Sequence, residues 1–115
     1  MTALKLFFDG GCRPNPGPIE VAVVARGRTY LRTGLGEGSN DDAEWLALLY
    51  ALDVARDLGA TDLVLVGDST LVVRQASRDW PCRSPNFKRH FENFRVGAAA
   101  FVRRAEAGEI GRAHV

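Results

Sequence analysis

At the start of the chain, hydrophobic and polar residues follow one another with the two-residue spacing of a β-strand. Residues 3–9 alternate between apolar and polar side chains and then become wholly apolar, which is typical of a strand near the middle of a sheet. Prolines at positions 14, 16 and 18 exclude a ladder strand directly after it. Residues 19–26 and 29–35 predict two further strands, joined by a turn at residues 26–28. These segments together predict an antiparallel meander.

The spacing then becomes that of a helix. Apolar side chains recur three or four residues apart along one helical face, at Ala43, Leu46, Ala47, Tyr50, Ala51, Val54 and Leu58. Ser39 or Asn40 can cap the start of this helix, and Gly59 can end it.

The second half of the chain predicts a crossover and a return to the sheet. Residues 62–68 are too few for a helix and rich in branched side chains, so they predict a buried strand parallel to the first. Helices are expected from residue 69 to about 77 and from residue 87 to about 105, and a last strand from residue 109. The fold class is therefore α/β, with a five-stranded mixed sheet. It consists of an antiparallel meander of strands 1–3, then parallel strands 4 and 5, with helices on both faces.

Composition narrows the class of protein. A chain of 115 residues, 46% of them hydrophobic, suits one domain spanning residues 1–115. No apolar run approaches the roughly 20 residues that span a bilayer, and the first residues do not resemble a secretory signal, so we expect a cytoplasmic protein. Cys12 and Cys82 lack partners at metal-ligand spacing and are interpreted as free thiols.

Charge is divided unevenly along the chain. Residues 1–70 hold ten acidic against six basic side chains, a net −4, and residues 71–115 hold four against nine, a net +5. Ordinary scatter of solvated charge is one interpretation. The other is a cation-binding centre beside a surface for a polyanion.

Three carboxylates stand at special places in this outline. Asp9 ends the first predicted strand, Glu44 lies in the first turn of the first helix, and Asp68 ends the fourth strand. A right-handed crossover brings the first and fourth strands side by side, so Asp9 and Asp68 are expected at one sheet edge, within reach of Glu44. Converging carboxylates repel one another unless a cation neutralises them, and oxygen ligands select Mg²⁺ or Mn²⁺. Two such ions about 4 Å apart can cleave a phosphodiester.

Each of these acids also has a purely structural interpretation. Asp9 with Gly10 can form a turn, Asp68 with Ser69 can cap a helix, and Glu44 can favour the helix dipole.

The sequence resembles ribonuclease H type 1 in four motifs that occur in the family's order: Asp9-Gly10-Gly11, residues 15–18, residues 38–44, and residues 67–69 with 71–75. The resemblance covers nearly the whole chain. It implies hydrolysis of the RNA strand of an RNA–DNA hybrid, leaving 5′-phosphate and 3′-hydroxyl ends, with two Mg²⁺ ions bound alongside the substrate (Mn²⁺ being an alternative). Asp9, Glu44 and Asp68 match the family's metal-binding and catalytic acids.

The same resemblance implies a set of nucleic-acid contacts. Asn15 and Asn40 match positions that contact the minor groove and the RNA 2′-hydroxyl, the group that distinguishes RNA from DNA. Ser39 takes the place of a threonine that contacts a DNA phosphate. Gly10 and Gly11 are expected to turn the backbone sharply beside Asp9 and to lie against the substrate. Gln75 is expected near the groove, and Trp80 at the sugar–phosphate backbone.

The chain departs from the family pattern in two ways. Asp41 replaces a second amide after Asn40, which adds a negative charge beside a polyanion. The sequence also stops at Val115, before the loop histidine and the fourth aspartate of the family, and His114 matches a strand position. We therefore expect three carboxylates, a weaker second metal site and impaired activity.

Two other functions remain as alternatives. One is a nucleic-acid-binding module of the same fold that cuts weakly or not at all. The other is a related DNA endonuclease or integrase, which fits the acids but not the motifs around Asn15 and Asn40. We also expect that an apolar face of the sheet, left open by the missing helix, is covered by a second copy in a homodimer.

Overall fold

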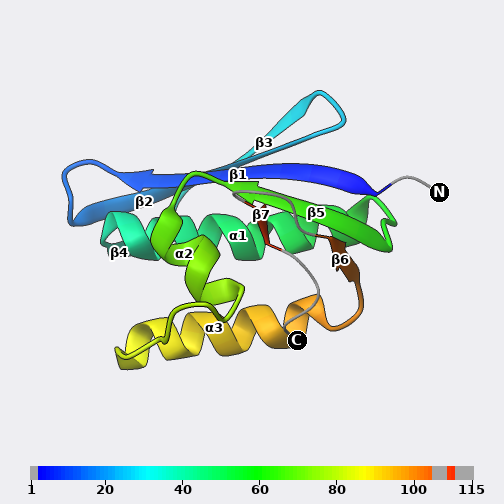
Figure 1. Ribbon diagram of the computed structural model, residues 1–115. Helices are drawn as coiled ribbons and strands as arrows, with labels where there is room; N and C mark the ends of the chain where they lie inside the picture. Colours follow the sequence, from blue (N-terminus) through cyan, green and yellow to red (C-terminus); the bar gives the residue numbers. More distant parts are fainter. Residues whose placement is uncertain (1–2, 105–108, 111–115) are drawn as a thin grey trace.

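The computed structural model describes residues 3–104 and 109–110, with side chains through Phe101 (Figure 1). Its strands are β1 (Leu4–Cys12), β2 (Gly17–Ala25), β3 (Arg28–Arg32), β4 (Glu37–Gly38), β5 (Asp62–Gly67), β6 (Val102–Arg104) and β7 (Glu109–Ile110). Its helices are α1 (Asn40–Asp57), α2 (Thr70–Ala76) and α3 (Pro85–Ala98).

The strands form one mixed sheet in the order β3-β2-β1-β5-β6, with β4 paired to β2 and β7 to β5. β1 runs antiparallel to β2 and parallel to β5, so the predicted meander and crossover are confirmed. The crossover sets the first and fourth long strands side by side, with Phe8 opposite Gly67.

The helices lie on one side of this sheet (Figure 1). Side chains along β1 alternate accordingly: Leu6 and Phe8 are buried, whereas Phe7 is 47% exposed. The prediction of helices on both faces is therefore wrong for the described residues. Leu31, 71% exposed, also belongs to the open face.

α1 connects the sheet with the outer helices. Nine of its residues are buried, and the largest of them, Trp45, contacts the ring of Phe94 in α3 edge-on, with the ring centroids 6.4 Å apart. The helix begins at the capping residue Ser39 and ends before Gly59, whose φ of +70° favours glycine. Both boundaries were predicted.

The end of the chain differs from the prediction. α3 stops at Ala98, and the Phe101 N–H donates to the Ala98 carbonyl in the turn that follows. The parallel strand beside β5 is therefore β6, and β7 pairs with β5 in the antiparallel direction. The spacing of Ala98, Phe101 and Val102 continues the helical period, but pairing with the free edge of β5 replaces it. Residues 111–115 of the predicted last strand, with His114, lie outside the described residues.

In the part of the chain that the structure describes, no helix is both long and apolar enough to span a lipid bilayer.

Candidate active site and nucleic-acid interface

Asp9 and Asp68 lie side by side on the two central parallel strands. Phe8 is paired with Gly67, so the next residue on each strand is one of these aspartates. Both side chains are exposed. Asp68 directly follows the end of β5, as predicted, but Asp9 does not end its strand, because β1 continues to Cys12. The pairing with β2, where Asp9 is opposite Ala22, keeps this part of the chain extended.

Glu44 reaches Asp9 because α1 packs very closely on β1 at Gly10. A Cβ atom at Gly10 would lie 2.1 Å from the Ala43 carbonyl oxygen and 2.9 Å from the Glu44 nitrogen, so only glycine fits. At this contact the Gly10 N–H donates a hydrogen bond to Oε1 of Glu44. The predicted sharp turn at Gly10 and Gly11 is wrong, since both lie inside β1. The glycine at position 10 serves helix packing instead.

Glu44 holds its proton unusually strongly. Burial, which leaves the residue 8% exposed, is the largest cause, and the pKa of Glu44 rises from 4.5 to about 7. The hydrogen bond from Gly10 opposes this rise. A hydrogen bond with Asp9 and the negative charges of Asp9 and Asp68 add to it. The three predicted carboxylates therefore act on one another electrostatically.

The donor chemistry of this cluster suits a hard cation. All three side chains offer oxygen atoms, and a cation would offset both the burial of the Glu44 charge and the repulsion from Asp9 and Asp68 that adds to the rise in its pKa. The geometry of a metal site is not preformed, however. Within residues 3–104 and 109–110, no group of three or more acidic, histidine or cysteine side chains is arranged to hold a metal ion.

Asn15 and Asn40 are joined to the end of β1. Oδ1 of Asn40 accepts from the Cys12 N–H at 3.1 Å, and Oδ1 of Asn15 accepts from the Asn40 N–H at 3.1 Å. The buried Cys12 thiol lies 3.3 Å from the same Asn40 oxygen. Both asparagines are exposed, and no hydrogen bond found among the described residues uses their NH₂ groups. These two groups are therefore placed to donate to a ligand.

A cavity of about 670 Å³ on the open face of the sheet borders one member of the carboxylate cluster and one of the two asparagines. Asp9 lies on its wall together with Gly10 and Gly11, and Asn40 lines it as well. The structure thus brings one of the predicted catalytic acids and three of the predicted nucleic-acid contacts to one surface.

Ser39, Gln75 and Trp80 have different environments. Ser39 caps α1, accepting from the Asp42 N–H at 3.1 Å. Gln75 is 4% exposed and its side chain is engaged within the protein: its Oε1 accepts from Trp45 at 3.2 Å and its Nε2 donates to the Pro81 carbonyl. This burial argues against the predicted groove contact of Gln75.

Trp80 is 45% exposed and borders a second cavity of about 450 Å³. Arg78 and Lys88 share that cavity, so an aromatic ring and two cations lie together there. Both predicted free thiols are confirmed, with Cys82 lining the same cavity.

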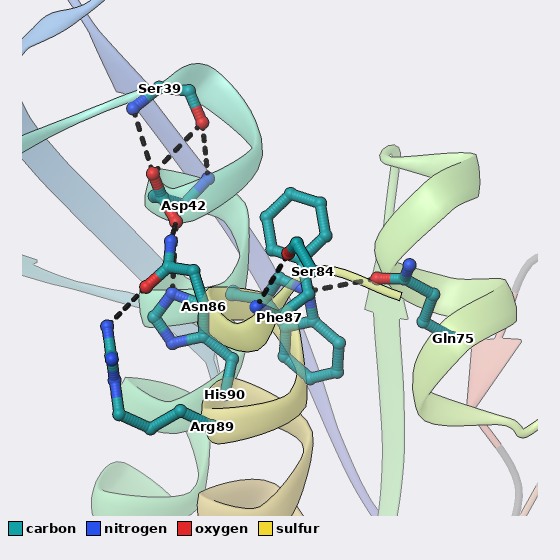
Figure 2. A network of polar contacts seen from close by, with 9 residues as sticks. Ser39, Asp42, Gln75, Ser84, Asn86, Phe87, Arg89 and His90 are labelled. Carbon is teal, nitrogen blue, oxygen red and sulfur yellow. Dashed lines mark hydrogen bonds and ion pairs between the residues drawn. The ribbon is translucent and has the colours of Figure 1, made fainter. Parts of the chain in front are cut away.

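Sequence reasoning missed a polar network behind Ser39, shown in Figure 2. Asp42 accepts hydrogen bonds from Ser39 on one side and meets Asn86 and His90 of α3 on the other. Burial raises the pKa of Asp42, but the hydrogen bonds from Ser39 and His90 outweigh it and leave this pKa below its ordinary value. A signal for half of the network was present, since Ser39 and Asp42 have the spacing of a capping box.

Comparison with known proteins identifies the family. A family model described as "Reverse transcriptase-like" matches residues 7–105, which is most of the chain. The chain belongs to this family. Its relatives include ribonucleases H, in agreement with the four motifs.

Ribonuclease HI of Halobacterium salinarum is 39% identical over 88 residues, covering 72% of this chain and 44% of the relative. Bifunctional protein Rv2228c of Mycobacterium tuberculosis is 36% identical over 101 residues, covering 83% of this chain and 28% of the relative. The chain thus spans less than half the length of either curated relative.

Solved structures match the fold. The crystal structure of RNase H1 from Halobacterium salinarum superposes with a TM-score of 0.82 at 33% identity, covering 87% of this chain and 80% of that one. LC11-RNase H1 in complex with an RNA/DNA hybrid gives a TM-score of 0.73 at 29% identity, covering 83% and 75%. The chain therefore has the ribonuclease H fold.

Proposed function

We propose that this protein is a metal-dependent endonuclease that hydrolyses the RNA strand of RNA–DNA hybrids, leaving 5′-phosphate and 3′-hydroxyl ends. The observation on which the proposal depends is the cluster of Asp9, Glu44 and Asp68, in which burial, with a further contribution from the charges of Asp9 and Asp68, raises the pKa of Glu44 to about 7. Membership of a family that includes ribonucleases H supports it, as does the likeness to a neighbour solved with a hybrid.

Asp9, Glu44 and Asp68 are the residues proposed to hold Mg²⁺. When bound, the metal activates the attacking water and stabilises the leaving oxygen. Asp9 and Asp68 lie exposed on the two central strands, where a phosphodiester can approach. Glu44 is held against β1 by a hydrogen bond from the Gly10 N–H. Because Glu44 binds a proton below about pH 7, loading of the site requires this carboxyl to release it.

The asparagines are proposed to recognise the RNA strand. Their amide oxygens are occupied by the protein, so the NH₂ groups of Asn15 and Asn40 face the ligand as donors for groove atoms and for the 2′-hydroxyl. Ser39 lies next to Asn40, and its hydroxyl, which donates to Oδ2 of Asp42 at 3.1 Å in the free protein, is proposed to exchange that partner for a phosphate of the DNA strand. Arg89 of α3, which donates a hydrogen bond to Asn86 on the same helix, adds positive charge near Ser39 and Asn40.

The proposal is tested with an end-labelled hybrid incubated with Mg²⁺, with Mn²⁺ or with chelator. The wild type is expected to cut the RNA strand with either metal, and Asp9→Asn to lose at least about 100-fold in rate. Asp57→Asn, at the far exposed end of α1, is the matched control and should cut normally. Cleavage by wild type and Asp9→Asn at the same rate would refute the assignment.

The second candidate is a binding module that holds hybrids without cutting them. The absence of a preformed three-ligand metal site among the described residues favours it. Gel-shift titration of the same hybrid distinguishes the two, because a binding module would retain the hybrid equally well as wild type and as Asp9→Asn while cutting with neither.

A further inference from the structure

His90 of α3 lies behind the start of α1, where the proposed nucleic-acid contacts Ser39 and Asn40 are found. The contacts that the described residues give it are with Trp45 and Asp42. It is 7% exposed, and its ring stacks on Trp45 with centroids 6.0 Å apart and planes 17° from parallel. Its Nε2 lies 3.1 Å from Oδ1 of Asp42. The imidazole therefore has a packing partner on one side and a carboxylate at its tip.

Asp42 links His90 to the start of α1 (Figure 2). Its second oxygen, Oδ2, accepts from the N–H and the hydroxyl of Ser39, each at 3.1 Å. Asn86 donates to the same Oδ1 that His90 meets. One carboxylate thus binds two side chains of α3 and two groups of the capping residue, so the position of Ser39 depends on α3.

Packing alone does not account for a histidine at this position. An apolar aromatic ring would fill the same space against Trp45 without bringing a nitrogen into a largely buried site. Among the hydrogen bonds of the described residues, Nε2 of His90 meets Asp42, and Asp42 in turn binds the N–H and the hydroxyl of Ser39 in the capping turn of α1. Asn40 follows Ser39 in the chain, and its backbone N–H donates a hydrogen bond to Oδ1 of Asn15.

We propose that His90 and Asn86 are positioning residues for the nucleic acid: through Asp42 they hold Ser39 and Asn40 in the orientation that grips the hybrid. This inference rests on the proposed function. Glu44 is anchored separately, by the Gly10 N–H, so loss of the network should weaken substrate binding more than it slows the chemical step.

The test uses His90→Phe, which keeps the stacked ring and removes the nitrogen. We expect KM for the hybrid to rise about three- to tenfold with kcat within about twofold, and the amide hydrogens of Ser39 and Asp42 to exchange faster by a similar factor. His90→Gln, whose amide nitrogen can reach Asp42, should recover most of the loss. Asn86→Ala should act in the same direction without disturbing the core. Val96→Ala, which changes no charge at a position of the same helix that is 62% exposed, is the control.

The inference would be overturned if His90→Phe kept the KM and the amide exchange of the wild type. It would also be overturned if kcat fell by the same factor by which KM rose. A change in melting temperature alone would overturn it as well, since that indicates a packing role. If the wild-type protein neither binds nor cuts hybrids, the proposed function fails. Exchange at Ser39 and Asp42 in His90→Phe and Asn86→Ala then still decides whether α3 holds this turn.

Discussion

The close contact between Gly10 and α1 allows a sharp prediction for Gly10→Ala. The added Cβ would lie 2.1 Å from the Ala43 carbonyl oxygen and 2.4 Å from its carbon, which is more than about 1 Å inside normal contact distance. Both partners are backbone atoms of packed elements, so neither can rotate away. α1 must move outward by about 1 Å, and Glu44 moves with it.

Two effects should follow from this shift. Overpacking of this kind costs about 1–3 kcal/mol, which corresponds to a fall of roughly 5–15 °C in melting temperature for a chain of this size. Displacement of Glu44 by about 1 Å relative to Asp9 should slow cleavage by about 100-fold. Urea unfolding measures the first effect, and single-turnover cleavage of a hybrid measures the second.

Gly11→Ala is the matched stability control for Gly10→Ala. The nearest atom to a Cβ at Gly11, Oδ1 of Asn40, is 3.9 Å away, so the methyl group fits and stability should change by less than about 1 kcal/mol. Equal stability of the two variants would show that α1 does not press on β1 at position 10. If Gly10→Ala cleaved the hybrid as fast as the wild type, the position of Glu44 relative to Asp9 would not matter for the reaction.

Two further substitutions test the electrostatics of the site. Because the folded-state pKa of Glu44, about 7, exceeds its ordinary value of 4.5, its contribution to stability is fully present below pH 4.5 and is lost as pH rises through 7. The full shift corresponds to about 3 kcal/mol, which solvent screening at the site's rim reduces to about 1–2 kcal/mol. Glu44→Gln should therefore flatten the fall in stability of the metal-free protein between pH 5 and 8 in urea titrations, and an unchanged slope would contradict this cause. Asp41→Asn should tighten hybrid binding about two- to fivefold at low salt, because it removes a negative charge and supplies a donor. If Asp57→Asn tightens binding equally, the effect is one of net charge rather than of position.

The sequence was sufficient to predict the parts of the site that depend on chain order and on local rules. Strand pairing follows from a crossover between apolar segments, and it set Asp9 beside Asp68. The start of α1 follows from a capping pattern, which set Glu44 one turn into the helix. Each inference needed only the spacing of neighbouring residues and the handedness of the connection.

Contacts between distant segments could not be predicted in this way. The local sequence does not distinguish a glycine that turns the chain from one that lets a helix pack closely on a strand. The role of Gly10 could therefore be recognised only once the position of Ala43 was known. The burial of Gln75 depends on Trp45, 30 residues away, and β6 depends on the free edge of β5. The ring of His90 satisfies the helical period of α3 whether or not a carboxylate meets it.

The first turn of α1 is held from two sides, and this arrangement separates binding from chemistry. The contact with Gly10 fixes Glu44 against β1, while Asp42 fixes Ser39 against α3. The two anchors share no atom, and they act on side chains to which the proposed function gives different roles. A change on the α3 side should therefore appear mainly in KM, and a change at Gly10 mainly in kcat.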